Sequence, residues 1–209
     1  MSQTKASILE NSRQLFNRFG YVNIRLQHIA DEVGISVGNL AYHFKNKDAI
    51  LEVLYQTIEQ EHKNLLAELR IVPLFANIDV HIRNTFQLQL KYSFFYMDLL
   101  EILRADPVIK RNFREYSEWL QAQIGMMLDF NVARGSLRAE PIEGQYALLA
   151  QQFVMLSTLW RYHHRVRGHE QPEESDYVAM VWGLLIPYFT DQGMLEFKQM
   201  NALGNYNWM

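Results

Sequence analysis

The sequence of 209 residues contains no cysteine. Disulfide frameworks, cysteine-based zinc sites and cysteine nucleophiles are therefore excluded, while a reducing compartment is permitted. Long apolar runs are also missing: the longest uncharged stretches, 144–160 and 177–190, are either interrupted by glutamines or too short to span a membrane. The first residues carry no apolar signal segment. We therefore expect a cytoplasmic protein with no membrane partner.

The sequence has little excess charge of either sign: its net charge is −3. The composition is 49% hydrophobic and 21% charged. Bulk disorder and an overall polycation are thereby excluded. The charge is unevenly distributed, however. Residues 1–50 hold six Lys/Arg and four Asp/Glu, which leaves fourteen and nineteen for residues 51–209. A basic head on an acidic body predicts two modules, with any nucleic-acid affinity confined to a local patch.

Sustained period-two alternation is absent, so no β-sheet is expected. Apolar residues instead recur every three or four positions, which predicts an all-α protein. A first helix should end at Gly20, a short one should cover 26–33, a third should begin after Ser36, and a fourth should run from Asn46–Lys47 to just before Pro73.

Four long helices are expected in the rest of the chain, at 77–104, 107–134, 142–167 and 174–200. Asp106-Pro107 and Glu140-Pro141 resemble helix starts, because proline is favoured in the first turn. Pro187 should kink or split the last helix, because its ring removes a backbone hydrogen bond.

Residues 26–44, LQHIADEVGISVGNLAYHF, have the spacing of a helix-turn-helix. Ala30 is small enough for two helices to cross closely, and Gly34 can adopt the positive φ of a tight turn. Ser36 is a good N-cap for the second helix, and Leu40 can fill the angle between the two helices. Such a second helix places its N-terminal part against base edges in the DNA major groove.

The flanks of this motif add a family resemblance, carried by LFNRFGY before it and YHFKNKDAIL after it. Together, residues 8–51 closely resemble the DNA-binding domain of the TetR family of bacterial transcriptional regulators. The resemblance implies a three-helix DNA-binding domain at residues 1–47. It also implies a larger helical domain at 48–209 for ligand binding and dimerisation.

One position departs from the family pattern. The family usually has threonine, or a Thr/Ser pair, three and four residues after the tyrosine, where it caps the second helix and touches a phosphate. Here these positions are Ile24 and Arg25. Asn23 is the alternative cap that we expect, and Arg25 can reach a phosphate through its charge.

The candidate DNA contacts lie at the outward positions of the second motif helix and beside it. Asn39 can pair with an adenine edge, and Val37 and Ala41 can touch a thymine methyl. For Tyr42 and His43 the resemblance implies phosphate contacts. The full set is Arg25, Val37, Gly38, Asn39, Ala41, Tyr42, His43, Lys45 and Lys47. For the two lysines the alternative is solvated loop charge.

The C-terminal part is rich in aromatic residues and methionines, which suit adaptable apolar binding sites. The candidate ligand-binding residues are Phe94, Met97, Trp119, Met126, Met127, Phe130 and Phe153. For any one of them, ordinary core packing is the alternative. As a set they favour a small, largely apolar effector.

The last two long helices are apolar on more than one face, which predicts a homodimer formed through them. Two DNA-binding heads can read a palindromic operator in double-stranded DNA. The family resemblance favours a repressor, which the effector releases from its operator.

Two other interpretations stay open. The protein could be a constitutive DNA-binding regulator with a ligand-free core. It could also be an all-α metal-binding protein that uses Glu59 with His62, or His163 and His164 with His169. The chain has no phosphate-binding loop, dinucleotide-binding glycines, zincin motif or nucleophile elbow, so we expect neither an enzyme nor a cofactor.

Overall fold

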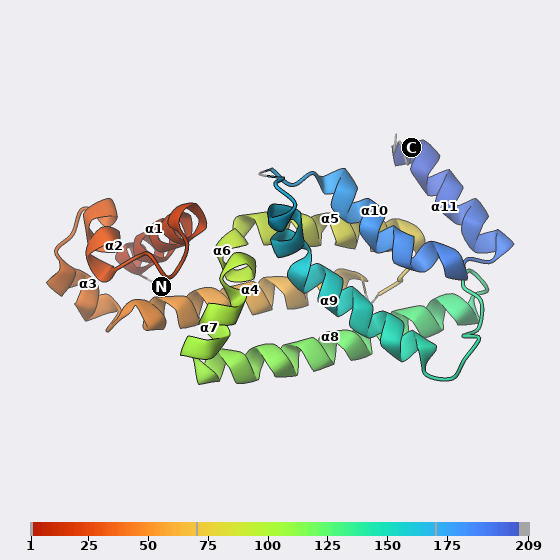
Figure 1. Ribbon diagram of the computed structural model, residues 1–209, viewed down its shortest axis with the longest axis horizontal. Helices are drawn as coiled ribbons and strands as arrows, with labels where there is room; N and C mark the ends of the chain where they lie inside the picture. The colour runs from red at the N-terminus through yellow and green to blue at the C-terminus, as the bar shows by residue number, and fades with distance from the viewer. Residues whose placement is uncertain (1, 70, 170, 205–209) are drawn as a thin grey trace. The chain divides into compact units, whose positions relative to one another are not determined.

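The computed structural model describes residues 2–69, 71–169 and 171–204. These residues form helices and no β-strand, with one isolated bridge between Leu137 and Phe189. The helices (Figure 1) are α1 (Gln3–Phe19), α2 (Leu26–Val33), α3 (Val37–His43), α4 (Lys47–Leu69), α5 (Phe75–Lys91), α6 (Ser93–Met97), α7 (Leu99–Ala105), α8 (Pro107–Ala133), α9 (Gln145–Val166), α10 (Glu174–Leu185), a 3-10 turn at Ile186–Tyr188, and α11 (Asp191–Gly204). The predicted all-α class is confirmed.

The helices divide into two compact units. Unit 1 comprises residues up to 62 together with 88–114, and unit 2 comprises 63–87 together with residues from 115 onward. Helices α4, α5 and α8 each contribute residues to both units. Among the described residues, no helix combines the length and the apolar character that a membrane span requires.

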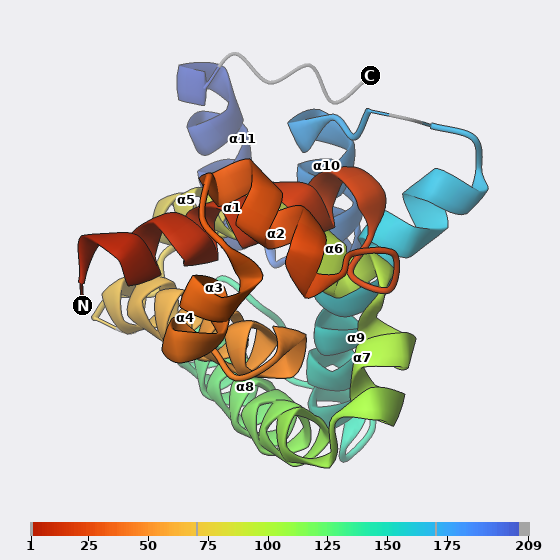
Figure 2. The same cartoon turned by 90° about the vertical axis from the view of Figure 1, so that its left-hand side faces the viewer.

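Unit 1 is built around Phe16, whose ring packs 5.2 Å from Tyr21 and 5.3 Å from Phe94. The apolar positions predicted from their three- and four-residue spacing form the core around it. Its fully buried aliphatic residues are Ile8, Ile29, Leu40, Ile50, Leu51 and Ile102. Figure 2 turns α1, α2 and α3 toward the viewer.

The single helix predicted at 77–104 is wrong, because the chain breaks at Tyr92 and at Asp98 into α5, α6 and α7. The breaks are stabilised by polar side chains and backbone groups of α1 and the turn after it. Asn17 donates to the Lys91 carbonyl at 2.8 Å and accepts the Phe94 N–H at 3.0 Å. Asp98 accepts the Tyr21 N–H at 2.5 Å. These hydrogen bonds satisfy backbone groups that a continuous helix would have used internally.

Unit 2 has an aromatic core. The Phe75 ring lies 5.3 Å from Trp182 and 4.8 Å from Phe189, and Phe197 lies 5.1 Å from Trp182. The buried Trp182 indole N–H donates to the Asp79 carboxylate at 2.9 Å. Aromatic side chains of this size bury large areas and account for much of the stability of such a core.

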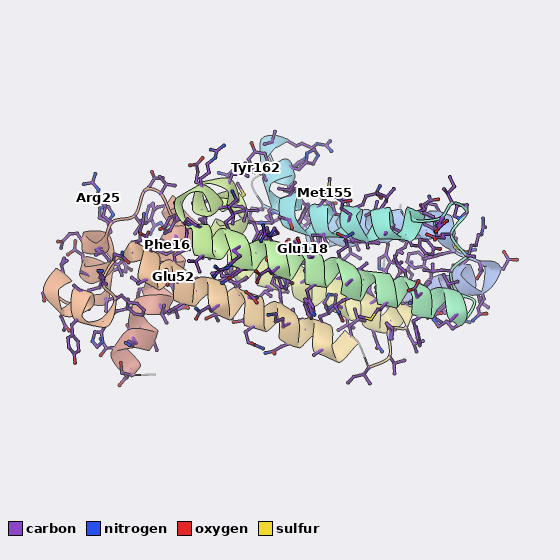
Figure 3. The ribbon with its side chains drawn as sticks, turned by 90° about the horizontal axis from the view of Figure 1, so that it is seen from below. Phe16, Arg25, Glu52, Glu118, Met155 and Tyr162 are labelled. Atoms are coloured by element: carbon purple, nitrogen blue, oxygen red, sulfur yellow. The ribbon has the colours of Figure 1, made fainter. Side chains whose placement is uncertain are left out.

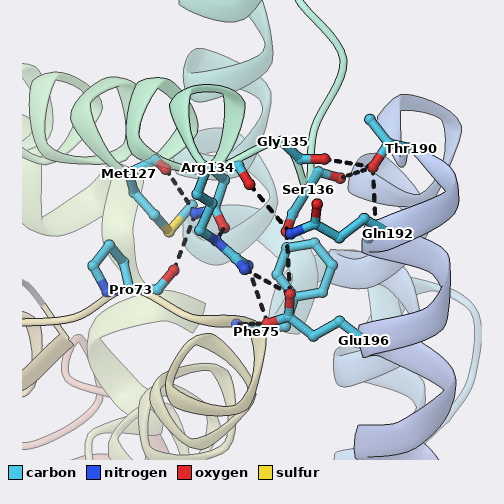
Figure 4. Close-up of polar contacts among 11 residues, drawn as sticks. Pro73, Phe75, Met127, Arg134, Gly135, Ser136, Thr190, Gln192 and Glu196 are labelled. Carbon is cyan, nitrogen blue, oxygen red and sulfur yellow. Dashed lines mark hydrogen bonds and ion pairs between the residues drawn. The ribbon is translucent and has the colours of Figure 1, made fainter.

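A polar cluster ties α11 to the start of α5 and the end of α8 (Figure 4). Arg134 makes two hydrogen bonds to Glu196, at 2.7 and 3.0 Å, and Glu196 also accepts the Phe75 N–H at 3.1 Å. Burial raises the pKa of Glu196, but these bonds outweigh it and hold the pKa below its ordinary value. Asn131 donates to the Pro73 carbonyl at 3.0 Å, which fixes the turn before α5.

The starts and breaks of the later helices are partly as predicted. Asp106 accepts the Ile109 N–H at 2.9 Å and begins α8 at Pro107, as expected. Pro187 splits the last helix into α10, the 3-10 turn and α11, also as expected. The start predicted at Glu140-Pro141 is wrong, since α9 begins at Gln145.

The reason for the late start of α9 is local. Gly144 has a φ of 84°, and a right-handed α-helix cannot continue through a residue with this φ. Glu140 acts as a cap from outside the helix, because its carboxylate accepts the N–H groups of Gly144 at 3.2 Å and Tyr146 at 2.9 Å.

Candidate DNA-binding surface

The turn between α2 and α3 has the geometry that the sequence predicted. Gly34 has a φ of 76°, in the left-handed region, and the Ile35 N–H returns to the Ala30 carbonyl at 3.0 Å. Ala30 is fully buried, so the close crossing depends on its small side chain. Ser36 accepts the Asn39 N–H at 3.1 Å and begins α3. The helix pair is therefore a true helix-turn-helix.

Helix α3 presents two different faces. Leu40 is fully buried and Phe44, just after the helix, is nearly so. Among the candidate contacts, Val37 and His43 are half-buried, and the exposed ones on α3 are Gly38, Asn39, Ala41 and Tyr42. The Tyr42 side chain is 86% exposed. A helix anchored from one side in this way leaves its other side available to a ligand as large as duplex DNA.

The start of α2 differs from the prediction. Asn23 does not cap this helix, because its amide donates back to the Phe19 carbonyl of α1 at 2.8 Å. The ring Nδ1 of His28 instead accepts the Arg25 N–H at 3.2 Å. Histidine is a rare cap, so no sequence signal pointed to it. Arg25 itself is exposed, and Figure 3 shows its side chain extending away from the helices.

The two candidate lysines after α3 have different surroundings. Lys45 is exposed. The Lys47 ammonium donates to the Tyr21 carbonyl at 2.8 Å and lies 4.0 Å from the centre of the Tyr21 ring. Burial lowers the pKa of Lys47, although Asp48 and Asp98 act in the opposite direction. Lys47 is thus engaged within unit 1.

Tyr21 links the turn after α1 to the start of α4. Its hydroxyl donates to Asp48 at 2.5 Å, and burial together with this bond raises the pKa of the phenol. Asn46 accepts the Ala49 N–H at 2.9 Å and caps α4. Tyr21 and Asp48 could not be predicted as a pair from the sequence, because they are separated by 27 positions and no local pattern connects them.

The seven candidate ligand-binding residues divide between the units. Phe94 and Met97 belong to unit 1, where Phe94 packs against Phe16. The other five belong to unit 2, on α8 and α9: Trp119, Met126, Met127, Phe130 and Phe153. Met126 and Phe130 are exposed, Trp119 and Met127 are half-buried, and Phe153 is buried.

Neither histidine group forms a metal centre in the described ranges, where no cluster of three or more His, Asp or Glu residues is placed as metal ligands. His62 lies 2.6 Å from the Tyr96 hydroxyl. The His164 ring lies 4.8 Å from His169, and its Nε2 lies 3.3 Å from the Gln171 carbonyl.

Comparisons with known proteins match both parts of the chain. The family profile described as "Bacterial regulatory proteins, tetR family" matches residues 8–54, and the profile "Bacterial transcriptional repressor" matches 59–197. The HTH-type transcriptional repressor AcnR of Corynebacterium glutamicum is 24% identical over 151 residues, which cover 71% of this chain and 77% of AcnR. The HTH-type transcriptional regulator RutR of Escherichia coli is 37% identical over 60 residues, 28% of each chain.

A solved structure has the same fold. The crystal structure of a TetR-family transcriptional regulator from Marinobacter aquaeolei VT8 superposes with a TM-score of 0.84 over 97% of this chain and 98% of that chain, at 24% identity. Fold and surface define a helix-turn-helix DNA-binding protein. The family profiles together match most of the chain, and the chain belongs to the TetR family. It is a DNA-binding transcription regulator, in a family whose members bind small molecules and form dimers.

Proposed function

We propose that this regulator is a cytoplasmic homodimeric repressor that binds a palindromic operator through residues 1–47, with residues 48–209 serving ligand binding and dimerisation. The exposed face of α3 supports the proposal most directly, because Tyr42 is almost fully exposed on a helix held by Leu40. Asn39 reads a base edge, and Val37, Gly38 and Ala41 approach the groove. The phosphates are contacted by Arg25, Tyr42, His43 and Lys45.

Dimerisation through α9 and α10 is supported by exposed apolar area. The α9 stripe consists of Leu148, Met155, Leu159, Tyr162 and Val166, all at least 45% exposed. Their spacing of seven, four, three and four residues keeps them on one side of the helix, opposite the buried Phe153 and Trp160. In Figure 3, Met155 and Tyr162 lie along the outer edge of α9.

Helix α10 adds an exposed face with little side-chain bulk. Met180 is 42% exposed, and Gly183 is exposed with no atom near the position that a Cβ would occupy. A helix can approach such a face closely, as packing of ridges into grooves requires. A second copy of α9 or α10 is therefore the partner that fits.

A small, largely apolar effector releases the operator in this proposal. Asn17 accepts the Phe94 N–H of α6, and the Tyr21 N–H donates to Asp98. These hydrogen bonds join the DNA-binding helices to the segment between α5 and α7. An effector that favours another arrangement of this segment thereby disfavours the DNA-binding arrangement. The coupling equals the difference in effector affinity between the two states.

The test is a selection of duplexes from a random pool with purified protein, followed by binding titrations of the selected site. Asn39→Ala should lower affinity by about 10- to 100-fold and relax sequence preference at one position per half-site. Tyr42→Ala should weaken binding with little change in preference. Gln56→Ala, at an exposed position of α4, is the matched control. Unchanged affinity and preference in both α3 variants would refute α3 as the recognition helix.

A further inference from the structure

Buried polar atoms of unit 2 without a hydrogen-bond partner among the described residues include Arg161 Nε, Asn201 Oδ1 and three atoms on α5, α8 and α9. These three are the Thr85 hydroxyl on α5, the Gln123 amide oxygen on α8 and the Trp160 indole nitrogen on α9. The three residues are 7%, 9% and 2% exposed. Buried polar groups are nearly always paired, and an unpaired one lowers stability by about 1–3 kcal/mol. A bound ligand that pairs with these atoms would remove that cost.

The contrast with Trp182 makes the Trp160 indole unusual. Both side chains are almost completely buried in unit 2. The Trp182 N–H is paired with Asp79, whereas the Trp160 N–H has no partner in the described ranges. The Trp160 ring lies 6.2 Å from Phe86, 5.3 Å from Tyr177 and 4.7 Å from His164. Among its described residues, unit 2 thus provides a hydrogen-bond acceptor for the Trp182 N–H and none for the Trp160 N–H.

The three unpaired groups lie at similar levels along the helices. Helices α5 and α8 run in opposite directions in Figure 1, and Arg134 lies over the Phe75 ring at 5.1 Å. Thr85 follows Phe75 by ten residues and Gln123 precedes Arg134 by eleven, so at 1.5 Å per residue their levels agree to within about 10 Å. Trp160 lies near the same level, because its ring is 6.2 Å from that of Phe86, the residue after Thr85.

Apolar side chains share the same helix faces. Trp119 and Met127 lie one turn on either side of Gln123 on α8, and Phe153 lies two turns before Trp160 on α9. These are three of the residues that the sequence indicated for an apolar ligand. They supply apolar walls, and the unpaired groups supply the polar anchors that fix orientation in such sites.

Among the described residues, the α5 side of this interior carries no free charge, and on α9 burial lowers the pKa of Arg161, the residue after Trp160. His81 lies one turn before Thr85, and burial lowers its pKa to about 4, so the ring is neutral at physiological pH. The charged side chains of the preceding turns, Asp79 and Arg83, are paired with each other at 2.8 Å. A charged ligand group would find no counter-ion among them.

We infer that Thr85, Gln123 and Trp160 are the polar anchors of an effector site, and that the effector is an uncharged, largely apolar molecule with both a hydrogen-bond donor and an acceptor. The indole N–H requires an acceptor, the amide oxygen requires a donor, and the threonine hydroxyl serves either. This inference rests on the proposed ligand-responsive function and specifies its ligand class.

The experiment uses three probes of one shape: biphenyl, 4,4′-dihydroxybiphenyl and biphenyl-4,4′-dicarboxylate. Binding to the purified full chain is measured by calorimetry and by the shift in melting temperature, since a ligand of the folded state raises it. The diol should bind about tenfold more tightly than biphenyl, the increment of one neutral hydrogen bond, and the dicarboxylate should bind least. Gln123→Leu and Trp160→Phe should each lose most of this preference while still binding biphenyl.

Two further variants keep the result interpretable. Gln199→Leu, at an exposed position of α11, should retain the full preference. Thr85→Val, of nearly the same shape, replaces any variant whose circular dichroism shows misfolding. Equal binding of biphenyl and diol, a preference that survives in the anchor variants, tightest binding of the dicarboxylate, or no binding of any probe would each overturn the inference.

The selected duplex separates this inference from the proposed function. If the wild type binds the duplex but no probe, the anchors are wrong and the DNA-binding role stands. If the diol binds through the anchors but leaves duplex affinity unchanged, the site stands and effector-driven release by this ligand class is wrong.

Discussion

Helices α3 and α9 each bury one side and expose the other, but they expose different chemistry. The exposed residues of α3 are small or polar, apart from the aromatic ring of Tyr42. Those of α9 include the apolar α9 stripe. Small and polar groups suit base edges and phosphates, and contiguous apolar area suits a second protein surface. The contrast supports the proposal that α3 contacts DNA and that α9 contacts a second copy of the chain.

The two helices also differ in how they are held. Helix α3 has seven residues, too few to be stable alone, and depends on the Ser36 cap and the buried Leu40. Helix α9 has 22 residues and a long buried face of its own. Substitutions on the exposed faces should therefore separate DNA binding from assembly.

The largest effect is expected from Leu159→Glu. A charge in the α9 stripe would have to be buried in the dimer, so the variant should be monomeric in sedimentation experiments. Affinity for the selected palindrome should fall by about 100-fold or more, because two linked heads bind far more tightly than one. Leu195→Glu, an exposed position on α11, is the matched control.

The absence of cysteine allows a direct check of this prediction. Leu159→Cys introduces the chain's only thiol, and oxidation should yield a covalent dimer if α9 lies at the interface. Leu195→Cys should not. A dimeric Leu159→Glu protein with unchanged DNA affinity would remove the α9 stripe from the assembly.

Next in size is the pair Gly34→Ala and Gly38→Ala. Gly34 is in the left-handed region, so a Cβ there should lower the free energy of unfolding by about 1–2 kcal/mol. Gly38 is helical and its Cβ would meet only Ser36 Oγ at 3.9 Å, so alanine should stabilise α3 by about 0.5–1 kcal/mol. Urea unfolding measures both.

DNA titration gives these two variants opposite signatures. Gly38→Ala adds a methyl group to the proposed DNA face and should weaken duplex binding although the fold is more stable. Gly34→Ala should bind as the wild type does at temperatures where it is folded. A loss of binding that simply followed stability in both would argue against the face assigned to α3.

The helix-turn-helix could be predicted because its signals are local. Gly34, Ser36 and Leu40 act within a few residues of one another, and the same holds for Asp106-Pro107 and Pro187. The family resemblance depended on those short motifs as well. Local patterns of this kind report backbone conformation directly.

What could not be predicted depends on partners far apart in the sequence. The breaks at Tyr92 and Asp98 are stabilised by the Phe94 N–H bonded to Asn17 and the Tyr21 N–H bonded to Asp98, and no periodicity reveals these pairs. Burial of Lys47 follows from the same turn. A neighbouring lysine pair therefore looked equivalent in sequence and is not equivalent in structure.

That difference leads to a smaller effect. Lys45→Ala should weaken duplex binding several-fold and reduce the slope of log affinity against log salt by about 1, with unchanged stability. Lys47→Ala should instead lower the free energy of unfolding by about 1 kcal/mol, because the hydrogen bond and the ring contact to Tyr21 are lost. Equal salt slopes for wild type and Lys45→Ala would show that Lys45 is only solvated.

The smallest effect is expected from the polar cluster of unit 2, which shares no residue with α3 or with the α9 stripe. Glu196 has a lowered pKa in the folded state, so it stays charged to lower pH than in the unfolded chain. It therefore contributes stability above the unfolded pKa of about 4.3, and this contribution is lost as the pH falls through the folded pKa. Glu196→Gln should reduce the free energy of unfolding by about 1 kcal/mol at pH 7.

The measurement is the difference in urea stability between the wild type and Glu196→Gln from pH 7 to pH 3. The difference should begin to shrink as the pH falls below the unfolded pKa of about 4.3, and it should vanish once Glu196 is also protonated in the folded state. Duplex binding and dimerisation at pH 7 should be unchanged. A difference that does not vary with pH would mean that the paired geometry, and not the charge of Glu196, stabilises the contact with Arg134.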